Sequence, residues 1–407
     1  MKGRRQIVRA VLATLTALPV AAAIIAFGLG QEALNRADTA TSIALNPLSP
    51  EAWSARAAEL LAAGKRGDAA RHAVKSVERS PLNPEAGEIL GYVAETRGNP
   101  ASATAFMAVA AAMGWGNETA QLWLIEAETR TLKFRPALLR TDALLRQRKR
   151  RDELFGFLRD LTLRDDTLAA MAGRLALRPK WRKDFLHRLA GLTPQGFDGH
   201  ERLLLELAKT AAPPMPDEIN PFLSRLVSEG FYPNAYLAWR RLARDRESGT
   251  LIGDGLFTRL NRPGTGSPFE WKILPTPGLT LQVESSSRIG NVRALHIAAE
   301  GRPSGPVLEQ VLVLAPGTYL LSATWYATQR DSLQSLDWRL ECLPTGSRLR
   351  MNDRATFAAA DEWQLLERVV TIPPSGCGAQ RLQLAVDHDE SRDLDAWIHH
   401  VDLQRIN

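Results

Sequence analysis

The sequence is poor in cysteine and in aromatic residues. Two cysteines in 407 residues exclude a disulfide-framework fold and a Cys-rich zinc module. Aromatic residues make up 7% of the chain, and its seven histidines show no metal-ligand spacing such as H-E-x-x-H. A glycine-rich phosphate loop and a nucleophile elbow are also missing. These absences predict a non-enzymatic protein without a cofactor or a metal site.

The remaining composition is that of a folded, multidomain chain. Hydrophobic residues make up 45% and charged residues 24% of the sequence, and a mean hydropathy of -0.19 excludes a polytopic membrane protein. Because single cores stop growing at roughly 250 to 300 residues, this length predicts at least two domains. The formal net charge of +6 is compatible with acidic partners.

The N-terminus has the pattern of a membrane segment. Basic residues come first: Lys2, Arg4, Arg5 and Arg9. Residues 10–30 then carry no charge, and about 20 apolar residues are enough to span a bilayer. The positive-inside rule therefore predicts a cytoplasmic tail and signal-anchor over 1–31, in a single-pass protein of a bacterial inner membrane with its bulk in the periplasm. A signal peptide cleaved near residues 21–23 is the alternative.

A sequence motif recurs after 34 residues, within a region of helical periodicity. Pro47, Leu48, Pro50, Glu51 and Ala52 are repeated as Pro81, Leu82, Pro84, Glu85 and Ala86. The same offset joins Ala52 to Ala86 and Ala120, and independently joins Ala69 to Ala103 and Ala137. A fixed period of this length predicts stacked helical hairpins, each of which buries its apolar face against its neighbours.

Residues 32–150 resemble tetratricopeptide repeats. The positions that carry the resemblance are Trp53, Ala57, Ala69, Pro81, Gly91, Ala103, Ala110 and Ala137. The resemblance implies an α-solenoid in which small residues allow close helix packing and whose surface binds protein partners. Residues 151–250 keep the helical pattern without a clean period, and we interpret them as a divergent continuation.

One stretch is strongly basic and is a candidate surface for an anionic partner. It consists of Arg146, Arg148, Lys149, Arg150 and Arg151. A solvated helix face with ion pairs to nearby carboxylates is the alternative interpretation. We do not expect nucleic acid to bind, because interleaved aromatic residues are missing and an exported domain would not meet it.

The period changes near Leu251 from helical to alternating. The expected strands cover 279–283, 294–298, 307–314, 319–326, 336–342, 365–372, 382–386 and 397–403. This number of short strands predicts an antiparallel β-sandwich or jelly roll over 251–407. The predicted fold class is therefore α + β and multidomain, with a transmembrane helix, an α-solenoid and a C-terminal sandwich.

The succession of motifs in residues 251–407 resembles carbohydrate-binding modules of the galactose-binding, jelly-roll type. The motifs are Gly253 to Phe257, Pro268 to Trp271, Leu314 to Tyr319, and Trp397 to Leu403. The resemblance implies that exposed aromatic rings stack on sugars. The candidate rings are Trp363, Tyr326, Trp325 and Trp271, whereas alternation assigns Trp338 and Trp397 to the core. His399 and His400 stand where relatives carry an acidic pair, which argues against a structural calcium ion.

The two cysteines, Cys342 and Cys377, lie in this same region, and we expect them to form a disulfide in an oxidising compartment. A buried free thiol is the alternative.

These features together predict a membrane-anchored periplasmic scaffold. Its helical repeats would hold protein partners, and its jelly roll would bind an envelope polysaccharide, by resemblance in exopolysaccharide or capsule synthesis or export. An envelope glycosidase or lyase with its cleft in the sandwich, and an adaptor that binds only protein, are the alternatives.

Overall fold

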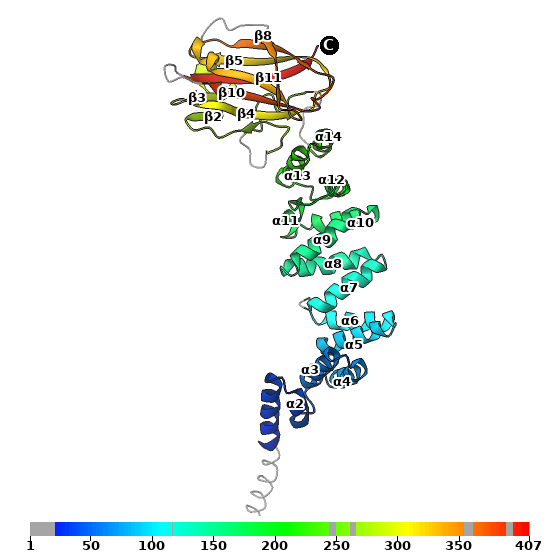
Figure 1. Ribbon diagram of the computed structural model, residues 1–407. Coiled ribbons are helices and arrows are strands. Elements are labelled where there is room, and N and C mark those ends of the chain that lie inside the picture. Colours follow the sequence, from blue (N-terminus) through cyan, green and yellow to red (C-terminus); the bar gives the residue numbers. More distant parts are fainter. Residues whose placement is uncertain are drawn as a thin grey trace, which may run out of the picture. The chain divides into compact units, whose positions relative to one another are not determined.

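The computed structural model describes residues 21–115, 117–243, 250–260, 266–353, 361–387 and 394–406. The chain forms two compact units, Met1–Phe157 and Leu158–Asn407. Helices come first along the chain and strands follow (Figure 1). The fold class is therefore α + β, as the change of sequence period predicts.

The expected membrane span is contradicted. The first described helix covers residues 21–35, and its residues 21–30 carry no charge. Over the part of the chain that the structure describes, no helix is both long and apolar enough to cross a membrane. This finding overturns the predicted single-pass inner-membrane topology. Residues 10–20 of the expected span lie outside the described residues.

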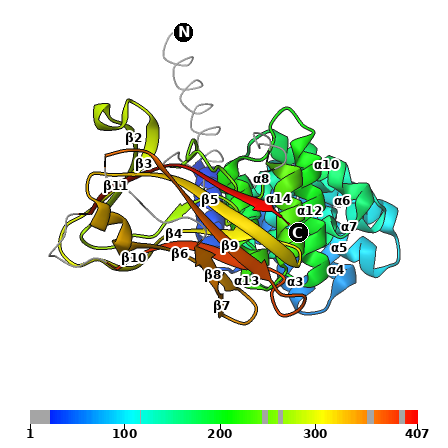
Figure 2. The same ribbon diagram turned by 90° about the horizontal axis from the view of Figure 1, so that it is seen from above.

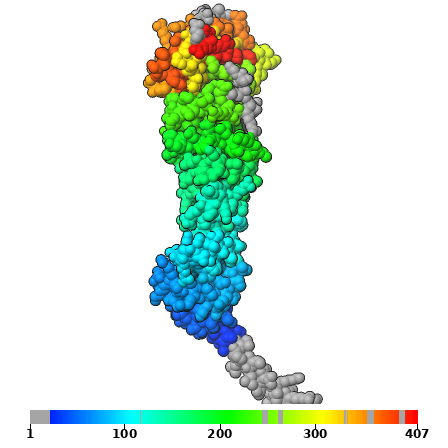
Figure 3. Space-filling model, turned by 90° about the vertical axis from the view of Figure 1, so that its right-hand side faces the viewer, coloured from blue at the N-terminus to red at the C-terminus, as the bar shows by residue number. Residues whose placement is uncertain are grey.

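The first unit is a helical repeat. Its helices are α2 (Thr39–Leu45), α3 (Pro50–Ala62), α4 (Arg66–Arg79), α5 (Pro84–Thr96), α6 (Pro100–Ala112), α7 (Glu118–Arg130) and α8 (Phe134–Arg146). Helices α3, α5 and α7 begin 34 residues apart, and so do α4, α6 and α8. Figure 3 shows the surface of these helices, with the colour changing in sequence order. The prediction of stacked helical hairpins is confirmed.

The period is built from helix caps. In front of α3, α5 and α7 stand Ser49, Asn83 and Asn117, and each side chain accepts a hydrogen bond from the backbone N–H three residues later. Such caps stabilise a helix start because they satisfy an N–H group that has no partner inside the helix. The capping residue, with an alanine three positions later, recurs in all three units and is the local cause of these helix starts; a proline follows the cap at α3 and α5.

Small residues sit where helices cross. Fully buried are Ala57, Ala69, Ala103, Ala110 and Ala137. Gly91 is also buried, and a Cβ added there would lie 2.9 Å from Cγ of Met107. Trp53 is buried and donates its indole N–H to the carbonyl of Pro47 at 2.9 Å. Pro81 differs from the prediction, because it is exposed and lies in the turn between α4 and α5 rather than in the packing.

The helices continue beyond the repeat. They are α9 (Arg151–Thr162), α10 (Asp165–Ala176), α11 (Arg182–Leu186), α12 (Pro194–Ala208), α13 (Pro216–Ser228) and α14 (Tyr232–Leu242). Between α11 and α13 a buried ion pair joins Arg182 to Glu218, with side chains only 4% and 9% exposed. Packing here is thus partly polar.

His200 on α12 is buried against the ring of Phe222, with ring centroids 5.0 Å apart. Its Nε2 has no hydrogen-bond partner. Burial, followed by the positive charge of Arg159, lowers the pKa of His200 to about 4. The folded protein therefore holds this imidazole neutral at a pH where an unfolded chain, with a pKa near 6.5, already binds a proton.

We predict an acid-dependent loss of stability from His200. Because its pKa is lower in the folded state, protonation favours unfolding as the pH falls from about 6.5 to about 4, and roughly 2 kcal/mol is lost by about pH 5. His200→Phe should remove this part of the loss. Urea unfolding of the wild type and of His200→Phe, at about pH 6.5 and at about pH 5, measures the loss in the free energy of unfolding. Equal losses in the two proteins would contradict the prediction.

The C-terminal part of the second unit consists of two antiparallel sheets. The first, in the order β1-β4-β10-β6-β7, contains β1 (Lys272–Ile273), β4 (Ser304–Leu312), β10 (Gln380–Asp387), β6 (Leu336–Cys342) and β7 (Ser347–Leu349). The second, in the order β2-β3-β11-β5-β9-β8, contains β2 (Leu279–Ser285), β3 (Arg293–Ala299), β11 (Leu394–Arg405), β5 (Gly317–Ala327), β9 (Gln364–Ile372) and β8 (Met351–Asp353). Figure 2 shows β11, β5 and β9 side by side. The eight expected strands are all present, and the sheets contain three further short strands, β1, β7 and β8.

The core lies between the sheets. In β6, Leu336, Trp338, Leu340 and Cys342 are buried in it while the residues between them are only partly buried, as the sequence alternation predicts. Ile252 and Phe257, from the segment before β1, pack into the same core. That segment is tied to β4, because the side-chain amide of Gln310 bonds both the N–H and the carbonyl of Gly253, at 2.9 and 2.7 Å.

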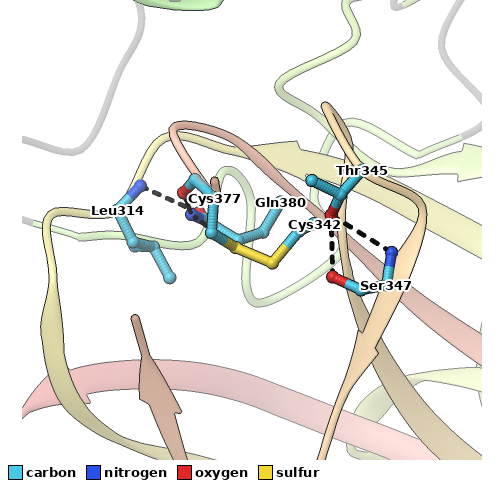
Figure 4. Close-up of a disulfide and its surroundings, with 6 residues drawn as sticks. All are labelled: Leu314, Cys342, Thr345, Ser347, Cys377 and Gln380. Atoms are coloured by element: carbon cyan, nitrogen blue, oxygen red, sulfur yellow. Dashed lines mark hydrogen bonds between the residues drawn. A yellow bond between two sulfur atoms is a disulfide. The ribbon is translucent and has the colours of Figure 1, made fainter. Parts of the chain in front are cut away.

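Cys342 and Cys377 form a disulfide, as predicted, with Cα atoms 4.8 Å apart (Figure 4). It joins the end of β6 to the turn before β10. The buried Gln380 braces this turn, because it donates to the carbonyl of Cys377 at 2.5 Å and accepts from the N–H of Leu314 at 3.0 Å. The cross-link closes 35 residues, a loop for which roughly 3 kcal/mol of stabilisation is typical.

Candidate functional site

The outer faces of the two sheets differ in chemistry. On the five-stranded sheet the outward side chains form ion pairs across strands, among them Lys272 with Glu309 at 3.5 Å and Arg381 with Glu341 at 3.0 Å. Such a ladder is typical of a solvated surface. On the six-stranded sheet, one end of the outer face carries aromatic rings instead.

These rings form a row across the strands, the aromatic row, made of His296, Trp397, Tyr326 and Trp363. His296 on β3 pairs directly with Trp397 on β11, which pairs with Tyr326 on β5. Trp363 comes next, immediately before β9, whose first residue, Gln364, pairs with Trp325. Neighbouring ring centroids lie 4.4, 5.7 and 5.6 Å apart, which are stabilising distances for aromatic pairs.

A β-bulge places Trp397 in this row. The register of β11 against β5 shifts between Ile398 and His400. In a regular strand every second residue faces the core, but here Ile398 and Val401, three positions apart, both do so. A bulge inserts one unpaired residue and reverses the alternation beyond it. The prediction that Trp397 lies in the sandwich core is therefore wrong: it packs on the outer face with Tyr326 and Ala294.

Carboxylates surround the aromatic row. Glu284 on β2 accepts a hydrogen bond from the indole N–H of Trp397 at 3.1 Å. His296 lies between two carboxylates, with Nδ1 3.3 Å from Glu284 and Nε2 2.7 Å from Asp395. Asp395 also pairs with Arg288 at 3.1 Å. The indole N–H of Trp397, with the amide of Gln282, lowers the pKa of Glu284, which therefore stays ionised.

The aromatic row is buried at one end and partly accessible at the other. Trp397 is only 2% and Tyr326 9% exposed, whereas Trp363 is half-buried against them. The hydroxyl of Tyr326 donates to Asp361 at 3.4 Å. Burial of this hydroxyl, and then the charge of Asp361, raise the pKa of Tyr326, so it remains a donor. A ligand would meet the ring of Trp363 beside a hydroxyl and a carboxylate.

The structure brings together two of the four candidate stacking residues, Trp363 and Tyr326. The other two are corrected: Trp271 and Trp325 are 3% and 2% exposed, and both pack on Trp338 inside the core. Alternation puts Trp325 opposite Tyr326, so only one of that pair can face outward. Sequence reasoning missed Glu284, Arg288, His296 and Asp395, which are far from Trp363 in sequence and reach this face only through the sheet.

Within the described ranges, no group of three or more His, Cys, Asp or Glu side chains could hold a metal ion. His399 instead makes a ring contact with Trp363 at 5.9 Å, and its Nδ1 lies 2.9 Å from the carbonyl of Arg293.

The basic stretch on the first unit carries internal contacts. Arg146 pairs with Asp142 at 2.9 Å, and Arg150 with Glu118 at 2.5 Å. Arg151 lies over the ring of Phe155 at 5.5 Å. These contacts favour the interpretation of Arg146, Arg148, Lys149, Arg150 and Arg151 as a solvated helix face.

Two solved structures that are similar to the C-terminal region of the chain are carbohydrate-binding modules. TmCBM61, solved in complex with β-1,4-galactotriose, has 17% sequence identity and a TM-score of 0.27, over 39% of this chain and 99% of its own. A second structure concerns the promiscuous specificity of carbohydrate-binding modules from the β-sandwich superfamily; it has 14% identity and a TM-score of 0.23, over 33% of this chain and 57% of its own. No protein-family model and no curated protein matches the chain.

Proposed function

We propose that the protein binds carbohydrate at the aromatic row. The observation that carries this proposal is the half-buried ring of Trp363, held by Tyr326 and flanked by the carboxylate of Asp361. The apolar face of a pyranose stacks on an aromatic ring, while its hydroxyls need fixed hydrogen-bonding groups at the edge. Both requirements are met together at this end of the six-stranded sheet.

We propose binding without catalysis. Glu284 and Asp395 are the two carboxylates that contact one imidazole, and both are engaged with His296 and its neighbours. A glycosidase requires a carboxylic acid and a carboxylate that are both free to face the scissile bond. If incubation with bound glycans released shorter products, the alternative of an envelope glycosidase or lyase would replace this proposal.

For the helices, we propose tetratricopeptide repeats that bind protein, so that the chain acts as a scaffold between a protein partner and a glycan. The support is the 34-residue interval of the caps and helix starts. Apolar side chains are also exposed on α6, at Phe106 and Val109, and at Met113, which caps its C-terminal end. A place in exopolysaccharide or capsule synthesis or export is proposed with it, by resemblance only.

The experiment is glycan binding by the full chain and by Trp363→Ala. The panel contains neutral, amino and acidic oligosaccharides, with β-1,4-galactan included. Loss of one stacking ring should weaken binding about tenfold, the upper range for an aromatic contact. Trp115→Ala is the matched control, because it removes an exposed indole from the first unit. Binding that is equal in wild type and Trp363→Ala, or no binding at all, would contradict the proposal.

A further inference from the structure

We propose that the sugar bound at the aromatic row is a hexosamine with a free, protonated amine. This inference rests on the proposed function and names the class of ligand. Its basis is the sign of the charge at the row, where carboxylates outnumber cationic groups in direct contact with the rings.

The contacts show this excess. Three carboxylates contact members of the row. Glu284 accepts a hydrogen bond from Trp397, Asp395 contacts the imidazole of His296, and Asp361 accepts a hydrogen bond from Tyr326. Among the residues that the structure describes, one guanidinium pairs with these carboxylates: that of Arg288, which contacts Asp395 and whose side chain is 66% exposed. The surroundings of the row are therefore negative.

Asp361 is the carboxylate placed to meet a ligand. It is exposed, and among the described residues the hydrogen bond from the Tyr326 hydroxyl is its side-chain contact. Glu284 and Asp395, in contrast, already have His296, Trp397 or Arg288 as partners. Asp361 and Trp363 both contact Tyr326, so a sugar stacked on the indole would place a ring substituent near this carboxylate. An ammonium substituent would form a charge-assisted hydrogen bond there.

The backbone at Asp361 allows a clean test. Its φ is +62°, in the left-handed region that asparagine tolerates better than most residues. Asp361→Asn therefore removes the charge and keeps both the shape and the turn. Asp402→Asn makes the same change on β11, five residues beyond Trp397 and about 17 Å along the strand; Asp402 contacts Gln404 at 2.8 Å.

The net charge of the chain makes the test discriminating. At +6, long-range attraction favours anionic polymers and opposes cationic ones. A preference for an amino sugar would therefore have to come from local contacts. A uronic acid, on the other hand, would bring its carboxylate against Asp361 and lose affinity by repulsion between like charges.

The experiment compares three oligomers of equal length, glucosamine, N-acetylglucosamine and galacturonic acid, by calorimetry on the full chain at about pH 6. We expect glucosamine oligomers to bind about fivefold tighter than N-acetylglucosamine oligomers, the most that one exposed ion pair typically supplies. This advantage should vanish in Asp361→Asn and in high salt, and persist in Asp402→Asn.

The outcomes separate the two proposals. Equal or tighter binding of the acetylated or the uronic oligomer, with Trp363→Ala still weakening it, overturns the amino-sugar inference and leaves carbohydrate binding intact. An amine preference that survives Asp361→Asn also overturns it. If none of the oligomers and no glycan in the wider panel binds, the proposed function itself is wrong.

Discussion

Replacing Arg182 with methionine is expected to lower the unfolding free energy of the second compact unit by about 3–5 kcal/mol. The guanidinium bonds both carboxylate oxygens of Glu218, at 2.7 and 2.6 Å. Its remaining N–H groups donate to the carbonyls of Leu175, Ala212 and Pro213. Without it, a carboxylate stays buried with no positive partner and three carbonyls lose a donor.

The expected loss comes from the unpaired charge, not from the absence of a favourable ion pair. Replacing both partners, as Arg182→Met with Glu218→Leu, should therefore recover most of the stability, because apolar groups of similar size can substitute for a buried pair. Hydrogen exchange of α11 and α13, combined with urea unfolding, measures both variants. A double variant as unstable as the single one would show that the packing, and not the charge, is responsible.

The adjacent residue supplies the matched control. Lys183 pairs with Asp217 at 2.6 Å, but both side chains are about half exposed. Water screens such a pair and competes for its hydrogen bonds. Lys183→Met should leave the protection of α11 and α13 close to that of the wild type, although it removes one positive charge from the same helix.

The helical half of the fold was predictable because its causes are local. A capping side chain, a proline and an alanine within four residues define the starts of α3 and α5, at Ser49 and Asn83, and these residues recur visibly in the sequence. The strand positions were predictable for the same reason, because the alternation of apolar and polar residues from Leu336 to Cys342 is visible along a short stretch of sequence. The membrane span was not confirmed, because none of the described helices is both long and apolar enough to cross a membrane.

The site depends on relationships between distant residues. Glu284, His296 and Trp397 meet because β2, β3 and β11 are neighbours in one sheet, and strand order is not visible in the sequence. The bulge after Ile398 has no sequence signature either, and without it Trp397 is assigned to the wrong face. Periodicity could place Tyr326 and Trp325 on opposite faces but could not say which face is solvent.

The net charge of the chain likewise did not predict the sign of the charge at the aromatic row. The sum over the sequence is positive, which is compatible with acidic partners. At the aromatic row the local sign is reversed, since Glu284, Asp361 and Asp395 outnumber Arg288. A ligand in contact with the protein responds to charges within a few ångströms, because salt screens the more distant ones. The net charge governs approach, and the local charge governs specificity.

The second large effect is expected at Gly255, where Gly255→Ala should destabilise the sandwich by about 3 kcal/mol or more. A Cβ at this position would lie 2.3 Å from the carbonyl oxygen of Val401. The contact cannot relax by turning a side chain, since both atoms are on or next to the backbone. Moving the strand away would break the 3.0 Å hydrogen bond from the N–H of Val401 to the carbonyl of Gly255.

The cost extends beyond this one contact because Gly255 lies between Ile252 and Phe257, which are 1% and 0% exposed in the sandwich core. Displacing the segment would pull both side chains out of their packing. Gly378→Ala is the control: it changes a glycine of the same sandwich at which a Cβ would meet no atom within 4 Å. Urea unfolding followed by the fluorescence of the buried tryptophans should show a large fall in the midpoint for Gly255→Ala and almost none for Gly378→Ala. Similar midpoints for the two variants would mean that the segment before β1 is not fixed against β11 by this close approach.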